Sequence, residues 1–476
     1  MTLNRMGWGA AALVGAALAL APPAHAQSPP PRMAGDLAAQ VRDYPNSRVL
    51  KRVIVQFVNG NAGRLDPAQL ARSVGGSAAT RLGLVNGAVM SVPYGQLKKL
   101  ATQPGVGWVS PDRQIVSQWD YDTETIGADQ VWNGTPGYRG TNVGVAVLDT
   151  GIVNRSADWK TLDGQRNRLA AWKDLVGGQS QPYDDNGHGS HVAGIVMGSG
   201  NLTDTSVTGQ RFTGVATDAR LVAVKVLGRN GSGSASTVIA GLDYCVANKS
   251  AHNIRVINLS MGVYPRESYK TDPLCAAVRR AVQAGIVVVR SAGNRGKDSQ
   301  GVIRYGGITS PGNEPSAITV GALNTNETID RSDDAVTSYS SRGPTYIDHV
   351  AKPDVVAPGN RVVSLRSVGS YLDSTSPTNV VPVAPDYFTL SGTSMAAPQV
   401  AGTVALMLQA NPSMCPNLVK GILMFTAQQL PLTDALGYPL SPGLSLLTQG
   451  AGSVNAAGAV ETASKIDTTQ PIGARW

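Results

Sequence analysis

The stretch VAVLDTG, residues 145–151, decides the fold prediction for this chain of 476 residues. An almost unbroken apolar run ends there at Asp149 and Gly151, which is typical of a strand buried on both faces of a parallel sheet. In open parallel sheets, sites form beyond the carboxyl ends of the strands. The stretch therefore predicts an α/β fold, with a mostly parallel sheet flanked by helices and Asp149 at the edge where a site forms.

Two further stretches supply chemical partners for Asp149. NGHGSHVAG, residues 186–194, places His188 between two glycines, and SGTSMAAPQVAG, residues 391–402, places Ser394 where a loop meets a predicted helix. A serine hydroxyl attacks a carbonyl when a base takes its proton and a buried carboxylate orients that base. A helix N-terminus also offers free N–H groups to an oxyanion. Asp149, His188 and Ser394 are therefore candidate catalytic residues.

Each of these residues also has a structural interpretation. Asp-Thr-Gly is good turn chemistry, a lone histidine often satisfies its hydrogen bonds in a core, and serine is a common helix N-cap. His188 and His191 could form a metal pair, but their spacing differs from the HExxH pattern and no matching ligands accompany them. Ala396 stands where the GxSxG pattern of lipases has its second glycine. Three long matches in one chain favour the catalytic interpretation.

The order Asp, His, Ser and the residues around each member resemble the subtilisin-like (S8) serine peptidases. The resemblance covers about 119–464, which implies a subtilisin-like catalytic domain there and a short C-terminal tail at 465–476. Ser190 replaces the threonine usual in the histidine motif and keeps the hydroxyl. The resemblance implies a serine endopeptidase that works through an acyl-enzyme and requires no cofactor for its chemistry.

The same resemblance assigns further site residues. Asn294, at the end of Ser-Ala-Gly-Asn, takes the role of the side-chain donor of the oxyanion hole. Ser260, Met261 and Gly262 match the strand along which an extended substrate peptide binds by main-chain hydrogen bonds. Thr309, before Ser-Pro, matches the floor of the first specificity pocket. A threonine there predicts that Leu, Met or Ala are preferred over very large aromatic side chains.

The first 26 residues have the features of a secretory signal peptide. Arg5 is followed by the apolar run from Ala10 to Ala21 and by an Ala-His-Ala cleavage site at 24–26. The sequence has no other segment long and apolar enough to span a bilayer. We therefore expect a secreted protein, periplasmic or extracellular, with no membrane partner. An uncleaved interfacial helix is the alternative, which the Pro-Pro pair at 22–23 disfavours.

Residues 27–118 contain a small predicted domain at about 48–116. Its alternation and turn signals predict a β-α-β-β-α-β order, which is the ferredoxin-like arrangement, with a hairpin turn at Asn86-Gly87. The domain resembles the inhibitory propeptide of the family. This implies a zymogen that cuts itself between Asp112 and Asp122 and is then inhibited by its own propeptide. A permanent accessory domain is the alternative.

Charge separates the two regions as well. The formal net charge is +8, and residues 27–118 hold 11 Lys and Arg against 4 Asp and Glu, whereas 119–476 hold 28 of each. The basic character therefore belongs to the N-terminal region, and the neutral remainder has no aromatic and basic stripe of the kind that binds nucleic acid. We expect peptide or protein substrates, no nucleic acid, and a monomer.

The three cysteines permit one disulfide in a secreted protein. Cys245 and Cys275 lie on predicted helices that flank the strand at Ile257, which makes them the disulfide candidate; small buried hydrophobic residues are the alternative. A structural calcium ion is compatible with the family, but no metal ligands can be assigned, since 199–214 differs from the loop that holds calcium in some members.

Two other functions fit parts of this pattern. One is a secreted protein of the same fold that binds peptides or processes only itself, although such proteins usually have a damaged triad or oxyanion asparagine, and none is damaged here. The other is an acyl hydrolase of another kind, which the peptide-binding segment at 258–262 and the propeptide disfavour.

Overall fold

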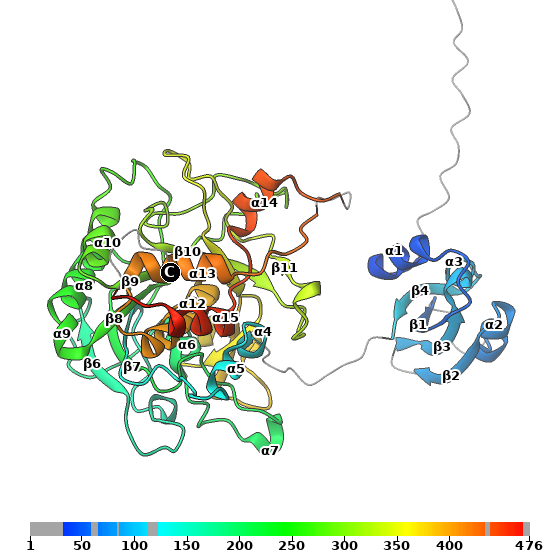
Figure 1. Cartoon of the computed structure of the whole chain (residues 1–476). Coiled ribbons are helices and arrows are strands. Elements are labelled where there is room, and N and C mark those ends of the chain that lie inside the picture. The colour runs from blue at the N-terminus through cyan, green and yellow to red at the C-terminus, as the bar shows by residue number, and fades with distance from the viewer. Residues whose placement is uncertain (1–31, 59–64, 83–84, 113–121, 434–437, 470–476) are drawn as a thin grey trace, which may run out of the picture. The chain divides into compact units, whose positions relative to one another are not determined.

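The structure, a computed structural model, describes residues 32–58, 65–82, 85–112, 122–433 and 438–469. The chain divides into two compact units, Met1–Val116 and Ser117–Trp476, each taken by itself below (Figure 1). The predicted signal peptide and residues 113–121 of the predicted cleavage segment lie outside the described residues. No described helix combines the length and the hydropathy needed to cross a membrane.

The small unit is an antiparallel sheet of four strands in the order β2-β3-β1-β4. Alternate residues of its central strand β1, Val53, Val55 and Phe57, are buried in one core together with residues of the helices. The predicted β-α-β-β-α-β order is confirmed. Its elements are α1 (Gly35–Asp43), β1 (Leu50–Phe57), α2 (Pro67–Ser73), β2 (Ser77–Leu82), β3 (Gly87–Pro93), η2 (Tyr94–Gln96), α3 (Leu97–Ala101) and β4 (Val106–Pro111).

Local chemistry explains these boundaries. Asp66 caps α2 by accepting a hydrogen bond from the Ala68 N–H at 2.9 Å. Asn86 has φ of 46° at the turn before β3, and a Cβ on Gly87 would lie 2.4 Å from the Val55 carbonyl oxygen. Helix α1 was not predicted, because Leu37 is its one apolar residue with a large, fully buried side chain and the periodic signal is weak.

The large unit is built on an eight-stranded sheet in the order β11-β10-β9-β8-β5-β7-β6, with β12 also paired to β10. All neighbours are parallel except β10 and β11. The predicted mostly parallel sheet is thus confirmed. The strands are β5 (Gly144–Asp149), β6 (Leu169–Asp174), β7 (Arg220–Lys225), β8 (Ile254–Leu259), β9 (Val287–Ser291), β10 (Ile318–Asn324), β11 (Ala335–Val336) and β12 (Val355–Pro358).

Helices cover both faces of this sheet (Figure 1). Along β5, Val145 and Val147 join the core beneath α6 (His188–Met197) and α12 (Thr393–Ala410), while Ala146 and Leu148 join the core beneath α8 and α10. This explains the unbroken apolar run, since every residue of the strand is buried. The other helices are α4 (Asp122–Thr125), α5 (Ala128–Trp132), α7 (Thr205–Thr208), α8 (Ala235–Ala247), α9 (Lys249–His252), α10 (Pro273–Gln283), α11 (Tyr371–Thr375), α13 (Pro416–Thr426), α14 (Pro442–Gln449) and α15 (Ala456–Lys465).

The carboxyl ends of the central strands meet at one edge of the sheet. Strand β5 ends at Asp149, β8 leads directly into Ser260, and β9 leads within three residues to Asn294. A separate hairpin of β13 (Val362–Leu365) and β14 (Tyr387–Leu390) comes before α12. Short 3-10 turns complete the unit at η3 (Ala157–Trp159), η4 (Arg331–Asp333) and η5 (Pro377–Asn379).

The disulfide prediction is wrong in this structure, where Cys245, Cys275 and Cys415 are all free thiols. Helices α8 and α10 do pack side by side, but the two thiols have different surroundings. Cys245 is buried among aliphatic side chains, whereas the Cys275 Sγ lies 3.3 Å from the Asn313 Oδ1 and 3.7 Å from the Ser310 Oγ. Neighbouring helices do not suffice for a disulfide, because its geometry also requires the two side chains to point at each other.

Candidate active site

Asp149 and His188, 39 residues apart in the sequence, form a hydrogen bond in the fold. The Nδ1 of His188 lies 2.8 Å from the Oδ1 of Asp149, and Asp149 is 1% exposed. The same Oδ1 accepts the Thr150 N–H at 2.7 Å, which fixes the carboxylate at the end of β5. With Nδ1–H donated to this carboxylate, the Nε2 of His188 is left as the proton acceptor.

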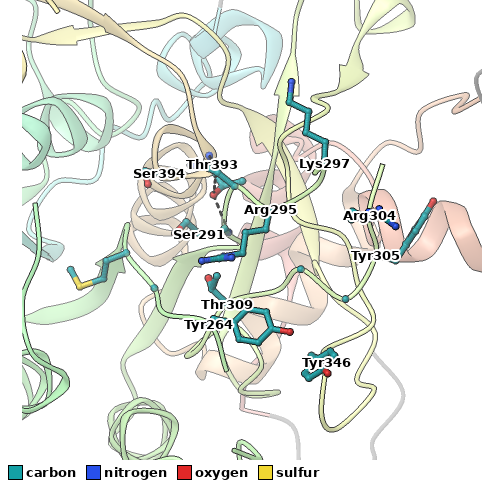
Figure 2. A pocket seen from close by; sticks show the side chains of 16 residues that line it. Tyr264, Ser291, Arg295, Lys297, Arg304, Tyr305, Thr309, Tyr346, Thr393 and Ser394 are labelled. Atoms are coloured by element: carbon teal, nitrogen blue, oxygen red, sulfur yellow. Dashed lines mark hydrogen bonds between the residues drawn. The ribbon is translucent and has the colours of Figure 1, made fainter. Parts of the chain in front are cut away.

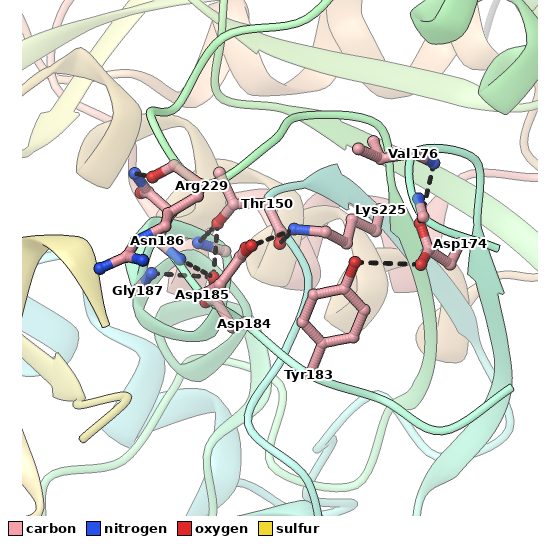
Figure 3. A network of polar contacts seen from close by, with 12 residues as sticks. Thr150, Asp174, Val176, Tyr183, Asp184, Asp185, Asn186, Gly187, Lys225 and Arg229 are labelled. Atoms are coloured by element: carbon pink, nitrogen blue, oxygen red, sulfur yellow. Dashed lines mark hydrogen bonds and ion pairs between the residues drawn. The ribbon is translucent and has the colours of Figure 1, made fainter. Parts of the chain in front are cut away.

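A second carboxylate, Asp184, holds the start of α6 in place. Its Oδ1 accepts from the Thr150 Oγ1 and the Gly187 N–H, each at 2.8 Å (Figure 3). Its Oδ2 accepts from the N–H and Oγ of Ser190 at 2.8 and 2.6 Å. Asp184 therefore connects Thr150, which follows Asp149, to Gly187 and Ser190, which lie before and after His188 in the chain. The hydroxyl of Ser190 is used in this contact.

Lys225 supports the same region from the neighbouring strand. It pairs with Asp149 in the register of β5 and β7, and its fully buried ammonium donates to the Thr150 carbonyl and, at 2.7 Å, to the Asp185 Oδ1 (Figure 3). Its Nζ also lies 4.7 Å from the ring centroid of Tyr183. The buried charge is thus paired, and the 150 and 185 loops are joined.

The pKa values of the two histidines of α6 are shifted in opposite directions. Burial disfavours the charged form of His188, but the charge and hydrogen bond of Asp149, with the charge of Asp184, outweigh it and raise the pKa of His188 above 6.5. Burial lowers the pKa of His191 to about 3. The His191 Nε2 lies 2.9 Å from the Phe388 carbonyl inside the core. His191 is therefore a neutral core histidine and does not face the same space as His188.

Ser394 is the second residue of α12 and lies beside the end of β8. Its Oγ donates to the Ser260 carbonyl at 3.1 Å, and the Ser260 Oγ donates back to the Ser394 carbonyl at 2.8 Å. Among the described residues, Ser394 and His188 have no direct hydrogen bond. The serine hydroxyl would have to turn away from Ser260 to reach a base, and such contacts are commonly loose without substrate.

Asn294 is oriented by the residue that precedes Ser394. Its Oδ1 accepts from the backbone N–H of Thr393 at 3.0 Å and from the Thr393 Oγ1 at 3.1 Å. Because the carbonyl end of the amide is fixed in this way, the Nδ2 end is available to donate. A Cβ on Gly392 would lie 3.3 Å from that Nδ2, so the glycine keeps the space beside it open.

Two depressions meet at the segment after β8. One of about 760 Å³ is lined by Asn294, Thr309 and Ser394 (Figure 2), the other of about 590 Å³ is lined by His188, and both are lined by Met261 and Gly262. The structure thus gathers all the residues predicted for catalysis and substrate binding around this segment. Among the described residues no group of three or more His, Cys, Asp or Glu is arranged to hold a metal ion.

Sequence reasoning missed three residues of this site. Asp184 and Thr393 lie inside or next to the motifs, but their contacts run to other segments of the chain. Arg295 follows Asn294 directly and lines the larger depression, where its side chain lies next to Tyr264 (Figure 2). A charged residue beside the asparagine was a readable signal for the chemistry of this pocket.

A mostly parallel sheet with Asp149, His188 and Ser394 near its edge is the arrangement expected of an α/β serine hydrolase. Residues 140–452 match the family model of the subtilase family, peptidase S8. The chain therefore belongs to the subtilase family and is a subtilisin-like serine protease.

Two relatives in sequence support this assignment. The chain is 39% identical over 354 residues to serine protease AprX of Bacillus subtilis, which covers 73% of each protein. It is 36% identical over 311 residues to subtilisin DY of Bacillus licheniformis, covering 65% of this chain and 92% of that one. A crystal structure of a cold adapted subtilisin-like serine proteinase matches 63% of this chain and 88% of the other at 31% identity, with a TM-score of 0.46.

Proposed function

We propose that this protein is a secreted serine endopeptidase whose catalytic residues are Asp149, His188 and Ser394. The observation that carries the proposal is the 2.8 Å hydrogen bond between His188 and the buried Asp149. An imidazole bound in this way by a carboxylate has its second nitrogen free to act as a base and is stabilised when it becomes charged.

The reaction follows from these roles. The Ser394 hydroxyl passes its proton to His188 Nε2 as Oγ bonds to the peptide carbonyl carbon, and the oxygen of the tetrahedral intermediate becomes negative. Asn294 Nδ2 and the N–H of Ser394 at the start of α12 donate to that oxygen. His188 then protonates the leaving amine, and water repeats the sequence of steps on the acyl-enzyme to release the second product and restore Ser394.

The substrate peptide binds along Ser260, Met261 and Gly262. Gly262 is exposed, and a Cβ there would lie 2.5 Å from the Thr309 Oγ1 and 2.9 Å from the Ser310 carbonyl. The glycine therefore lets this segment pack against Thr309 and Ser310, and its exposed backbone can pair with the peptide as an added strand. The side chain before the cleaved bond then enters the depression that Thr309 lines.

Secretion and self-processing complete the proposal. Residues 1–26 act as the signal peptide, and the basic region at 27–118 acts as a propeptide that is cut between Asp112 and Asp122, remains bound and inhibits until it is degraded. Two relatives carry the names extracellular serine proteinase, from Thermus, and alkaline serine exoprotease A, from Vibrio alginolyticus. The mature enzyme acts as a monomer, and any structural calcium serves stability alone.

The test uses residues 27–476 with and without Ser394→Ala. We expect wild type to be labelled by a fluorophosphonate probe, to cleave casein, and to show a new N-terminus between Asp112 and Asp122, while Ser394→Ala stays full length and unlabelled. Processing of Ser394→Ala at the same site, with no other protease present, would refute self-cleavage. Wild type that binds peptides but takes no label would instead be a binding protein of this fold.

A further inference from the structure

Cations line the depression beside Ser394. Arg295, Lys297 and Arg304 line it together with Tyr264 and Tyr346, and none of the lining residues that the structure describes is Asp or Glu. Figure 2 shows Arg295 reaching across the depression toward Tyr264 and Thr309, while the Lys297 ammonium extends away from them. The three cations therefore differ in how directly they face a bound side chain.

Arg295 is the cation that both faces the depression and has an available charge. In the described part of the chain Arg295 forms no ion pair, whereas Arg304 binds the carboxylate of Asp298 through both Nε and Nη2. The Arg295 guanidinium carbon lies 5.4 Å from the ring centroid of Tyr264, and its backbone N–H donates to the Ser341 Oγ at 3.1 Å. Its backbone is thus anchored next to Asn294, and its side chain rests on an aromatic face that leaves the guanidinium donors free.

A second cation lies beneath the floor. Arg290 is fully buried, and its guanidinium donates to the carbonyls of Thr309 and Met261 and to the Thr309 Oγ1. Burial lowers the pKa of Arg290 to about 9, so it remains charged near neutral pH. The carboxylate that approaches this floor, Asp272, accepts a hydrogen bond from Ser310 and does not line the depression.

We propose that this depression accepts an acidic side chain, glutamate above all, at the residue on the N-terminal side of the cleaved bond (P1). A glutamate entering past Met261 and Gly262 meets the Arg295 guanidinium, which matches a carboxylate in shape and charge. Lys and Arg at P1 meet Arg295 and, behind the floor, Arg290, and are excluded. This refines the expectation drawn from Thr309, which concerns size and not charge, and it rests on the proposed function.

The test compares four peptide substrates that differ only at P1, which is Glu, Gln, Leu or Lys. Glu and Gln have the same shape, so the ratio of their kcat/KM values isolates charge. We expect wild type to favour Glu over Gln by about tenfold, the scale of one ion pair at a partly solvated site, and to cleave the Lys peptide least. Raising the salt concentration should reduce the ratio.

Arg295→Gln should bring the Glu to Gln ratio to about one while cleavage of the Gln peptide continues. The matched control is Arg266→Gln, which removes the same charge from a guanidinium 5.6 Å from the same Tyr264 ring but outside the lining of the depression. It should retain most of the preference. Titration with a fluorophosphonate probe gives the concentration of competent enzyme for each variant. The Glu to Gln ratio of wild type tests the proposed preference even if a variant fails to fold.

The outcomes are distinct. A labelled wild type with a Glu to Gln ratio of one or less, or a preference for Lys, overturns this inference and leaves the proposed function standing. A ratio that Arg295→Gln does not change, or that Arg266→Gln lowers as much, overturns the role of Arg295. Wild type that takes no label and cleaves none of the four peptides overturns the proposed function and this inference with it.

Discussion

The two depressions that meet at Met261 and Gly262 differ in chemistry. The one that His188 lines is walled by aliphatic side chains such as Leu227 and Val238, while the one that Ser394 lines is cationic. The proposed base therefore lies beside apolar walls, although the charges of Asp149 and Asp184 raise its pKa, and the proposed nucleophile lies where negative charge is stabilised. Proton transfer has to pass from one environment to the other, and the predictions below test each side.

The largest loss of activity is expected for Ser394 and His188, which line the cationic and the apolar depression. Ser394→Ala should reduce kcat by at least about 10⁴-fold, because it removes the hydroxyl that is proposed to form the acyl-enzyme. His188→Ala, on the apolar side, should cost about as much, and the double variant little more than either one. Active-site labelling and peptide cleavage measure this. Additive losses in the double variant would show that the two residues do not act together.

On the cationic side, Asn294→Ala should lower kcat by about 10²–10³ with little change in KM, the effect found for the corresponding donor of subtilisin, a relative of this chain. The alanine variant loses the donor that Thr393 orients. Thr393→Val keeps the backbone hydrogen bond to Asn294 and should lose less. If Thr393→Val is as inactive as Asn294→Ala, the loss of activity comes from a disturbed start of α12 and not from the loss of the Asn294 amide.

On the apolar side, acid should switch the enzyme off. Since Asp149 and Asp184 raise the pKa of His188 above 6.5, the imidazole becomes charged as pH falls through a value above 6.5, and a charged imidazole cannot accept the proton of Ser394. A profile of kcat/KM against pH measures this midpoint, and a flat profile between pH 5 and pH 9 contradicts the role of His188.

Asp184→Asn removes one of the charges that raise the pKa of His188, so its acid midpoint should move to lower pH. Asp185→Asn is the matched control, because Asp185 pairs with Lys225 and does not contribute to the pKa of His188. Equal midpoints in both variants would mean that charge at Asp184 does not reach the imidazole.

The smallest effect is expected from a reductant, which acts on the thiols that lie beneath the two depressions. Cys245 packs with Val238 and Leu227 under the apolar depression, and Cys275 contacts Ser310 behind the cationic one. We expect three titratable thiols per unfolded chain and a change in Tm below about 1 °C on adding a reductant, since no disulfide worth about 2–4 kcal/mol is present. A clear drop in Tm on adding a reductant would show that Cys245 and Cys275 are paired.

Much of the fold was predictable because its signals are local. The apolar run at 145–148 identified a strand buried on both faces, and Asn86-Gly87 identified the hairpin of the small unit. Helix α1 escaped prediction because too few of its side chains are buried to give a periodic pattern. The cysteine pairing failed because two adjacent helices were inferred correctly, while the directions of their side chains were not.

The sequence by itself determined the class of chemistry. Asp149, His188 and Ser394 are marked by small residues that allow close backbone approach, and their order and contexts identify the family. Residue type, order and the short segments around each residue are sufficient for this, since these segments lie inside the stretch that the family model matches.

Only the tertiary structure decided what surrounds those groups. Three features depend on contacts between distant segments. They are the hydrogen bonds of Asp184 that position His188, the orientation of Ser394 toward Ser260, and the free charge of Arg295. Such contacts set pKa values and pocket charge through distances of a few ångströms. Local patterns encode the period of a helix or strand, but they do not encode which distant side chains meet across its end.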